Sequence, residues 1–361
     1  MNRPLRMWTL DRYLALTVAQ SFLLALATLV AVFSVINATE ELQQVGTGQY
    51  GVREALWFVV LTLPNEAYAL FPAAALLGSV IGLGGLAQRN ELVAIAAAGV
   101  SRSRVVWSVL QTAAVLALAG VLLSELVGAP LAYRARSERS AALSNGRTLT
   151  TGGGIWTRAG SSFVNMRTLL PSGAARDIYV YDFDEQHRMR RFTHAQAASY
   201  ADRRWRLEGL VDRVIGDDGV TTEQVAARDL PIELNPRQLG LMRMPPEELS
   251  LADLYRGIGA ARRQGESATH LELAWWQRAT TPVVTAIMVL LAIALVLSSE
   301  RSVKLGHRII VGALLGIGFQ LFNQTFASFG LVYGLAPWLG ALFPALLALA
   351  VGMWCLARTP R

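Results

Sequence analysis

The chain has 361 residues, of which 53% are hydrophobic and 16% charged, and its mean hydropathy is +0.37. This composition excludes an ordinary soluble protein of that length, because so much apolar surface does not fit into one water-soluble core. The net charge of +7 is compatible with nucleic-acid binding, but membrane proteins also gather basic residues in short cytoplasmic loops. The single cysteine, Cys355, excludes an intramolecular disulfide and a zinc site built on cysteines.

Six apolar stretches are long enough to be membrane-spanning helices, since about 20 residues cross a hydrocarbon core about 30 Å thick. A shorter apolar stretch precedes the second span, and Pro64 and Glu66 predict a kinked entry there. Glu125 lies near the end of the third span, where we expect its carboxylate to reach the membrane interface. The last three spans contain no charged residue. The six stretches are 14–37, 67–87, 105–127, 280–299, 309–333 and 338–357.

Arginine and lysine in short loops predict the orientation of a membrane protein. They precede the first span and occupy the loops 88–104 and 300–308, whereas the charged residues of the loop 38–54 are Glu40, Glu41, Arg53 and Glu54. Both termini are therefore predicted to be cytoplasmic. The long polar stretch between the third and fourth spans is predicted to be extracytoplasmic, because long loops are translocated regardless of their charge.

The polar stretch is predicted to contain an all-β domain, because its apolar residues alternate over short segments as in half-buried strands. Short strands separated by turn residues are typical of a β-sandwich, a jelly roll or an open β-barrel. Pro245 and Pro246 close the domain, and Ser250 caps a predicted helix at 250–263 that leads back to the membrane. The expected strands are 155–158, 163–166, 178–183, 205–214 and 220–225.

Nucleotide-binding motifs are missing or stand in the wrong context. The sole lysine, Lys304, is followed by leucine, so the chain has no phosphate-binding loop of the Gly-x-x-x-x-Gly-Lys-Ser/Thr type. Residues 46–51 spell Gly-x-Gly-x-x-Gly, but they join two membrane helices, which favours a plain turn over a dinucleotide site. If ATP drives this protein, another polypeptide must hydrolyse it.

One acidic cluster at the end of a predicted strand contains oxygen and imidazole groups of the kind that bind metals. Acidic residues are also ordinary in a solvated turn, which is the interpretation that we favour. Neither Gly-x-Ser-x-Gly nor His-Glu-x-x-His occurs, so we expect no catalytic residue, no metal site and no cofactor. The cluster consists of Asp182, Asp184, Glu185 and His187.

The cytoplasmic segment 88–104 is predicted to contain a short helix. Glu91 lies in its first turn, and Gly99 suits its C-terminal cap. Its apolar residues are Leu92, Val93, Ile95 and Ala96. Such a helix either docks into a groove on a cytoplasmic partner or rests on the membrane surface.

Two other groups of residues also have two interpretations each. Arg134, Arg136 and Arg139 follow the third span, where guanidinium groups either bind the phosphates of an anionic lipid or anchor the chain at the interface. The fifth span carries amides on one helical face, and amides in a bilayer either bond to another helix or line a cavity. These amides are Gln320, Asn323 and Gln324.

Several segments, taken in order, resemble the lipopolysaccharide export permeases LptF and LptG, also called the YjgP/YjgQ family. The resemblance is stronger to the LptG branch, runs almost from end to end and keeps the layout of six spans. The segments that carry it are 10–13 (Leu-Asp-Arg-Tyr), 71–78, 86–93, 154–156 with 163–164, 301–308 and 331–334.

The resemblance implies one permease subunit of an ABC transporter in the bacterial inner membrane. Its fold would be an α-helical membrane protein with six transmembrane helices and an inserted all-β periplasmic jellyroll domain. Residues 1–130 would hold spans one to three with a cytoplasmic coupling helix at about 88–100, and residues 131–272 the jellyroll with its connecting helix. Residues 273–361 would hold spans four to six.

The implied partners are a second permease of the LptF type, a cytoplasmic ATPase dimer of the LptB type, and periplasmic bridge proteins of the LptC and LptA types. The complex would extract lipopolysaccharide from the inner membrane and pass it to the bridge for export to the outer membrane. The subunit itself would not be an enzyme. The alternative is a membrane-anchored extracytoplasmic sensor or binding module without transport activity.

The resemblance also implies roles for individual residues, with Glu91 as the coupling-helix glutamate that enters a groove on the ATPase. Relatives often carry lysines near the outer end of the first span, where this chain has Asn37, Gln43 and Gln44. Either the arginines after the third span compensate or the substrate carries fewer phosphates. The expected ATPase-coupling residues are Arg89, Glu91, Leu92 and Ile95, and the expected substrate-binding residues are Arg134, Arg136, Arg139, Phe71, Phe319, Phe322 and Phe326.

Overall fold

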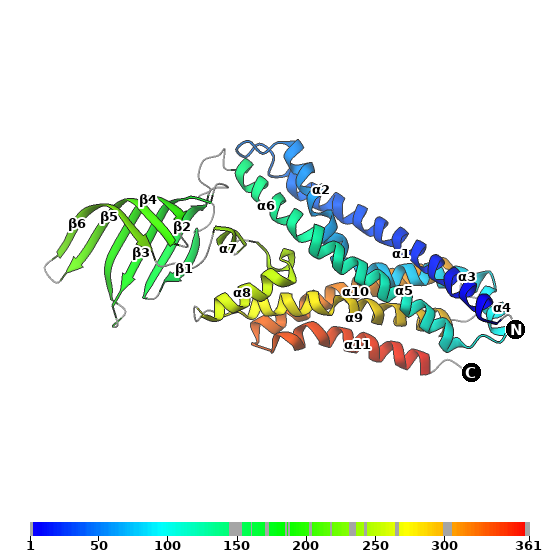
Figure 1. Ribbon diagram of the computed structural model, residues 1–361. Coiled ribbons are helices and arrows are strands. Elements are labelled where there is room, and N and C mark those ends of the chain that lie inside the picture. Colours follow the sequence, from blue (N-terminus) through cyan, green and yellow to red (C-terminus); the bar gives the residue numbers. More distant parts are fainter. Residues whose placement is uncertain are drawn as a thin grey trace. The chain divides into compact units, whose positions relative to one another are not determined.

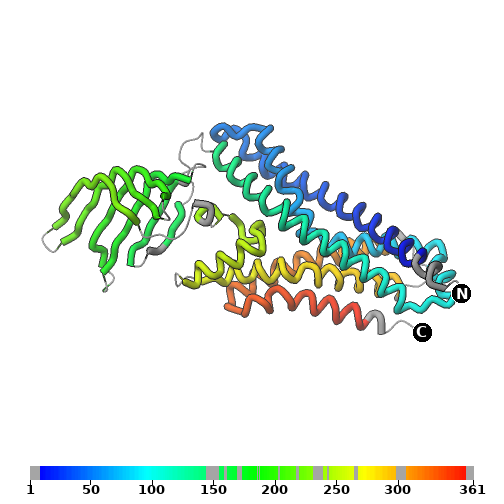
Figure 2. The backbone as a smooth tube through the Cα atoms, viewed as in Figure 1, coloured from blue at the N-terminus to red at the C-terminus, as the bar shows by residue number. Residues whose placement is uncertain are grey.

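The computed structural model falls into two compact units, which are described separately below (Figures 1 and 2). The helical unit comprises Met1–Thr39, Thr62–Pro130 and Thr269–Arg361, and the sheet unit comprises Glu40–Leu61 and Leu131–Ala268. The described residues are 3–143, 154–159, 161–169, 173–184, 186, 188–201, 204–216, 219–230, 236–241, 244–263, 267–298 and 305–357.

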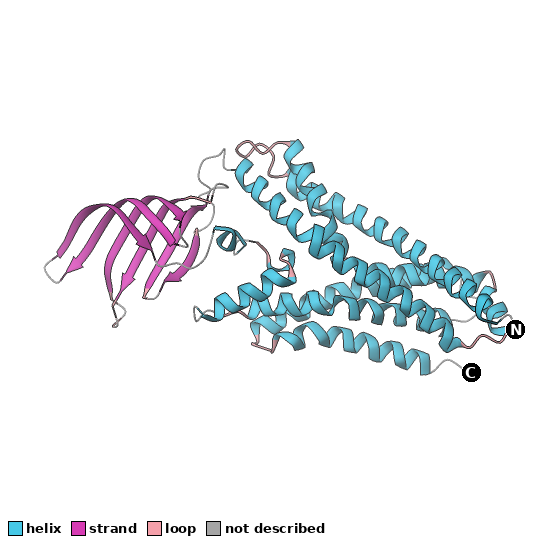
Figure 3. Ribbon diagram, in the orientation of Figure 1, coloured by secondary structure: helices cyan, strands magenta, loops and turns pink. Residues whose placement is uncertain are grey.

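Helices make up most of the described chain (Figure 3). The N-terminal half contains α1 (Arg3–Leu42), α2 (Val52–Ala69), α3 (Phe71–Gln88), α4 (Glu91–Ala97), α5 (Arg102–Leu123), the π-helix η1 (Ser124–Gly128) and α6 (Ala129–Leu143). The C-terminal half contains α7 (Pro236–Leu241), the 3-10 helix η2 (Pro246–Glu248), α8 (Leu251–Arg263), α9 (Thr269–Ser298), α10 (Leu305–Val332) and α11 (Pro337–Ala357).

The prediction of six spans is confirmed for the described part of the chain, where six helical stretches are long and apolar enough to cross a membrane. The kinked entry before the second span takes the form of two helices, because α2 ends at Ala69 and α3 begins at Phe71. The six stretches are Thr9–Leu42, Phe71–Gln88, Arg102–Leu143, Thr269–Leu297, Gly306–Val332 and Pro337–Trp354.

Helices α3 and α9 form the interior of the helical unit. In the most apolar 18-residue stretch of each helix, 78% of the residues of α3 and 61% of those of α9 are buried by the rest of the chain. The corresponding share is only 11% for α1 and 11% for α10. Gly78 and Gly82 let α1 approach α3 closely, because a methyl group on Gly78 would overlap the Phe22 backbone. The chain therefore buries two of its spans and leaves the sides of two others open.

The strands form one antiparallel sheet in the order β1-β2-β3-β4-β5-β6 among the described residues. Each strand thus pairs with its neighbour in sequence, as in an up-and-down meander, and the predicted jellyroll is not confirmed. The strands are β1 (Ile155–Ala159), β2 (Ser162–Leu169), β3 (Ala175–Phe183), β4 (Met189–Ala201), β5 (Arg204–Gly216) and β6 (Gly219–Leu230).

The long central strands bend at a corner that runs across β3, β4 and β5. Asp177 and Gly209 have positive φ angles of 51° and 64°, and in the pairing register both align with Gln196. A residue in the left-handed region breaks the regular pleat, and aspartate and glycine tolerate that conformation. In a regular strand, residues three apart face opposite sides of the sheet. Leu207 and Leu210 on β5 are both fully buried, so the face that is buried changes at the corner.

The core of the sheet unit consists mainly of aliphatic side chains, which surround the indole ring of Trp205. Trp205 is 0% exposed and packs among Leu207, Leu230 and other buried residues of the sheet, with Tyr200 at 5.3 Å between ring centroids. Leu239 of α7 contributes to the same core. Ser250 accepts a hydrogen bond from the Asp253 backbone N–H at 3.0 Å, which confirms the predicted start of the helix now seen as α8.

Asp184 orders the turn between β3 and β4 and gives the sheet unit a pH dependence. Its Oδ1 accepts the backbone N–H groups of Gln186 at 3.0 Å and Arg188 at 2.9 Å, and its Oδ2 accepts Arg190 Nε at 2.8 Å. The bond from Arg188, helped by the Arg190 charge, lowers the pKa of Asp184. Glu185 and His187 of the acidic cluster lie outside the described residues.

We expect this turn to loosen at acid pH. The folded carboxyl has the lower pKa, so its stabilisation is present above the unfolded pKa of about 3.9 and is lost as the pH falls through the folded pKa. Hydrogen exchange of the Gln186 and Arg188 amides, followed from about pH 5 down to about pH 2, should show the loss, because the folded pKa lies below the reference value. Asp184→Asn should exchange quickly at both pH values, and a turn that is equally protected in both variants would contradict the assignment.

Candidate functional site

Helix α4 is the predicted coupling helix, and sharp backbone turns delimit it. Asn90 precedes it with a φ angle of 59°, and Gly99 follows it with a φ angle of 85°. Asparagine and glycine are the residues that tolerate the left-handed region best, so the chain can reverse at both ends of a short helix. The predicted short helix is therefore confirmed, although at Glu91–Ala97 it is shorter than the expected 88–100.

The structure divides the expected coupling residues between two sides of α4. Arg89 is exposed before the helix, whereas Leu92 and Ile95 are half-buried against the core of the helical unit. Glu91 accepts a hydrogen bond from the Tyr13 hydroxyl of α1 at 2.6 Å. The exposed side chains of α4 are those of Val93, Ala94, Ala96 and Ala97, so two of the expected apolar residues, Val93 and Ala96, are exposed.

The three arginines of α6 all bind glutamates of the same chain. Arg134 pairs with Glu138 one helical turn away at 2.7 Å, and its side chain is 64% exposed. Arg136 holds Glu248 of η2 through two nitrogens. Only the exposed Arg134 keeps a guanidinium group that can turn to another anion at little cost, because a surface ion pair contributes about 0–1 kcal/mol.

Arg139 lies in a largely buried polar cluster of the sheet unit. Its Nε donates to Glu41 at 2.8 Å, its Nη2 donates to Gln44 at 2.6 Å, and its guanidinium lies 5.3 Å from the centre of the Phe58 ring. The Tyr50 hydroxyl also donates to Glu41, at 2.8 Å. Burial and the Glu41 carboxylate raise the pKa of Tyr50, so the tyrosine stays neutral as a donor.

Truncating these arginines should separate a structural role from a binding role. Arg139→Ala leaves Glu41 largely buried without its cation, and we expect a loss of about 2–3 kcal/mol in unfolding free energy. Arg134→Ala should cost no more than about 1 kcal/mol, since its pair is exposed. Thermal unfolding in detergent would measure both. Equal losses would contradict the difference that we infer from burial.

The four expected phenylalanines do not form one cavity wall within this chain. Phe71 is 5% exposed and belongs to the bundle core, where it packs edge-on against Phe22 at 5.1 Å and covers Gly120. On α10, Phe319 is half-buried, while Phe326 stacks on Phe343 of α11 at 4.6 Å. Phe322 is 39% exposed and is the one of the four that offers its ring to the outside.

Arg278 of α9 is the residue that the sequence analysis missed. Its side chain is 6% exposed, and its Nε donates to Glu125 Oε1 at 2.8 Å. Its terminal nitrogens donate to Asn65 Oδ1 at 3.2 and 3.3 Å and to the Ser124 hydroxyl. The Tyr68 ring covers the guanidinium at 5.5 Å. Arg278 thus joins α2, the π-helix and α9 inside the helical unit.

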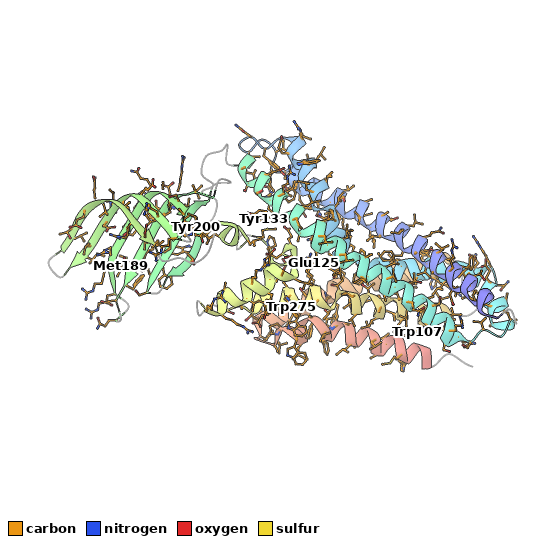
Figure 4. The ribbon with its side chains drawn as sticks, viewed as in Figure 1. Trp107, Glu125, Tyr133, Met189, Tyr200 and Trp275 are labelled. Carbon is orange, nitrogen blue, oxygen red and sulfur yellow. The ribbon has the colours of Figure 1, made fainter. Side chains whose placement is uncertain are left out.

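Glu125, labelled in Figure 4, pairs with Arg278, and its side chain is 22% exposed. That its carboxylate reaches the membrane interface stays a prediction. The expectation of a fourth span without charge is wrong, because the helix begins at Thr269 rather than at 280 and contains Glu272 and Arg278. Ser124 and Glu125, which both bond to Arg278, are the first two residues of the π-helix, and π-bulges are frequent at functional sites. The arginine just after Trp275 and Trp276 was the signal for this site in the sequence.

Known proteins match the chain along nearly its whole length. The family model "Lipopolysaccharide export system permease LptF/LptG" matches residues 12–358. The lipopolysaccharide export system permease protein LptG of Haemophilus influenzae is 35% identical over 353 residues, which is 97% of this chain and 98% of the relative. LptG of Escherichia coli K12 is 31% identical over 352 residues, with the same coverage. The chain belongs to the family of LptF/LptG lipopolysaccharide export system permeases.

Proposed function

We propose that this protein is a permease subunit that extracts lipopolysaccharide from the inner membrane for export to the outer membrane. The observation that carries the proposal is the unequal burial of its spans. Only 11% of the residues in the most apolar windows of α1 and α10 are buried by the rest of the chain. The exposed apolar sides of α1 and α10 would form one wall of a lipid-binding cavity, and a second permease of the LptF type would form the other wall.

An apolar compartment is what lipid extraction needs, because moving an acyl chain from lipid into water costs about 0.8 kcal/mol per methylene. Phe322 on α10 would contact the acyl chains. The half-exposed amides Gln320 and Asn323 lie on the same helix, and we assign them to hydrogen bonds across the interface with the second permease. Arg134, the exposed arginine of α6, would bind a headgroup phosphate.

Energy would reach the compartment from the cytoplasm, because the sequence has no phosphate-binding loop. We assign the docking surface for an ATPase dimer of the LptB type to the exposed side of α4, together with Arg89. Val93 and three alanines of α4 offer the small apolar contacts that suit a groove. Glu91 would act from the inner side of the same helix, through its bond to Tyr13.

We assign the sheet unit to the periplasm, where it would receive the lipid and pass it to bridge proteins of the LptC and LptA types. The glutamate-containing loop between α1 and α2, opposite loops rich in arginine, supports this side. The partly buried apolar side chains that pack on the edge of the sheet core, Tyr200 and Val225, would contact the acyl chains.

Purification in mild detergent, followed by mass spectrometry of copurifying proteins and lipid, tests the proposal. We expect a second permease, an ATPase subunit and lipopolysaccharide to copurify with the chain. Glu91→Ala should reduce lipid release by the reconstituted complex while Arg256→Ala, an exposed control in α8, should leave it unchanged. Recovery of the chain without any ATPase subunit would instead favour a membrane-anchored sensor or binding module.

A further inference from the structure

The sheet has a second face, opposite its aliphatic core. Neighbouring residues of a strand point to opposite faces of a sheet, and residues paired directly across two antiparallel strands point to the same face. Ile178 and Val180 of β3 are buried in the core, so Tyr179 between them points away from it. Its paired residue on β4 is His194. Tyr179 and His194 therefore lie together on the face that the core does not use.

Three planar groups are stacked side by side on this second face. The rings of Tyr179 and His194 are 4.8 Å apart, with an angle of 22° between their planes. The guanidinium carbon of Arg167 on β2 lies 4.8 Å from the centre of the Tyr179 ring. Because β3 lies between β2 and β4, Tyr179 lies between the arginine and the histidine. Stacking on a ring fixes the direction of a guanidinium group without using its N–H groups.

Asp177 adds a carboxylate to the stack. Its Oδ1 lies 3.5 Å from His194 Nε2, and the Nε2 atom is buried without a hydrogen-bond partner among the described residues. Both side chains can still be reached from solvent, since that of Asp177 is 43% exposed and that of His194 33%. The positive φ angle of Asp177 places its carboxylate beside the imidazole at the corner of the sheet. The two polar groups are thus close together, accessible and not hydrogen-bonded to each other.

Gln196 completes this group of side chains. It is exposed on β4 and aligns with Asp177 on one side and Gly209 on the other. A methyl group on Gly209 would lie only 3.2 Å from Gln196 Oε1, so the glycine leaves room for the amide. We call these side chains of β2, β3 and β4 the corner cluster, and they are Arg167, Asp177, Tyr179, His194 and Gln196.

The polar groups of the corner cluster restrict the ligand that fits it. A guanidinium group only donates hydrogen bonds, a carboxylate only accepts them, and an amide does both. An acyl chain would leave all three unpaired, and inorganic phosphate would be repelled by Asp177. The hydroxyl groups of a sugar can donate to the carboxylate and accept from the amide, while a phosphate on the sugar pairs with Arg167. A phosphorylated sugar therefore matches both charges of the cluster.

We propose that the corner cluster binds the phosphorylated saccharide of lipopolysaccharide. The inference rests on the proposed function, which makes lipopolysaccharide the substrate, and it adds a site for the sugar part. Arg167 bonds to the phosphate, whereas Asp177 and Gln196 bond to hydroxyl groups. The site lies on the opposite face of the sheet from Tyr200 and Val225, so sugar and acyl chains do not compete for the same side chains.

Titration with a water-soluble saccharide tests the site. The full-length chain is reconstituted in nanodiscs of phosphatidylcholine, and calorimetry follows the binding of lipopolysaccharide that has been stripped of its acyl chains. A second probe is the same saccharide after removal of its phosphates. Arg167→Gln should weaken binding of the phosphorylated probe about tenfold and remove the preference for it over the second probe. Asp177→Asn should weaken binding of both probes about tenfold.

Matched variants separate a loss of binding from a loss of structure. Asparagine tolerates a positive φ angle as aspartate does, so Asp177→Asn should keep the corner. Arg213→Gln is the control for Arg167→Gln, because Arg213 is also exposed and lies 5.7 Å from the Phe192 ring on the same face. It should leave both affinities unchanged. Hydrogen exchange of the β3 and β4 amides should be the same in the parent and all three variants.

The outcomes distinguish the saccharide site from the function on which it rests. Equal affinity of the parent and Arg167→Gln, or an equal loss in Arg213→Gln, would overturn the site. Inorganic phosphate that displaces the probe at the same concentration as the saccharide would overturn it as well. A parent protein that copurifies with lipopolysaccharide but does not bind the probe would overturn the site and leave the permease function in place. Absence of lipopolysaccharide and of an ATPase subunit from the purified parent would overturn the proposed function, whereas the titration would still decide whether the cluster binds the saccharide.

Discussion

Replacing Arg278 by leucine is expected to lower the unfolding free energy of the helical unit by about 3–5 kcal/mol. The change leaves the Glu125 carboxylate, the Ser124 hydroxyl and the Asn65 amide facing an apolar side chain inside the bundle. A buried charge without its partner costs far more than an exposed one, because neither water nor a counter-ion replaces the lost bonds. Thermal unfolding in detergent, followed by intrinsic fluorescence, would measure the loss.

Two further variants show whether the buried charge is the cause. Arg256→Leu on α8 removes an arginine that is 68% exposed, and it should change stability by no more than about 0.5 kcal/mol. Arg278→Leu combined with Glu125→Leu removes both charges and should recover much of the loss, since apolar replacements of buried ion pairs are often neutral. An Arg278→Leu protein as stable as the Arg256→Leu protein would contradict the role given to this centre.

The membrane spans were predictable because their signal is local. About 20 apolar residues in a row have few alternatives to a spanning helix, and turn residues such as Gly46 and Gly99 mark the ends of neighbouring helices. The wrong start of the fourth helix has the same origin. Because arginine is polar, hydropathy places the start of the span after Arg278. In the structure the helix already begins at Thr269, and Arg278 is paired with Glu125.

Partners from distant segments were not predictable from the sequence. Arg134, Arg136 and Arg139 look alike as a basic cluster at the end of a span. Their environments differ because Glu138 is a neighbour in the same helix, whereas Glu248 and Glu41 come from segments 112 and 98 residues away. The same holds for the two sides of α4, since helical periodicity shows which residues share a face but not what that face contacts.

The strand β4 was missed because no single period describes it. Thr193 and Ala195 are buried on one side of the corner and Ala198 on the other, so apolar residues are spaced by two and then by three. Alternation analysis detects a strand only while one face stays buried. Small buried residues such as alanine also give a weaker β signal than branched or aromatic ones. The equally long β5, which carries Trp205, Leu207 and Leu210, was for this reason expected at 205–214 while β4 was missed.

Replacing Trp205 by alanine is expected to destabilise the sheet unit by about 3–5 kcal/mol. The ring is fully buried, and its removal leaves a cavity among Leu207, Leu230 and Tyr200 that rigid strands on both sides cannot close. Hydrogen exchange of β4, β5 and β6 amides in the full-length protein would show the loss of protection. The helical unit should keep its protection, because Trp205 and its neighbours belong to the other compact unit.

Trp156→Ala is the matched control in the same sheet. Its ring is 51% exposed and stacks on Tyr181 at 5.7 Å, so its loss should cost about 0.5–1.5 kcal/mol. If both tryptophans gave equal losses, the sheet core would not depend on Trp205 as its burial indicates. Under the proposed function the comparison also separates folding from transport, since a folded Trp156→Ala sheet should still receive lipid while a loosened Trp205→Ala sheet should not.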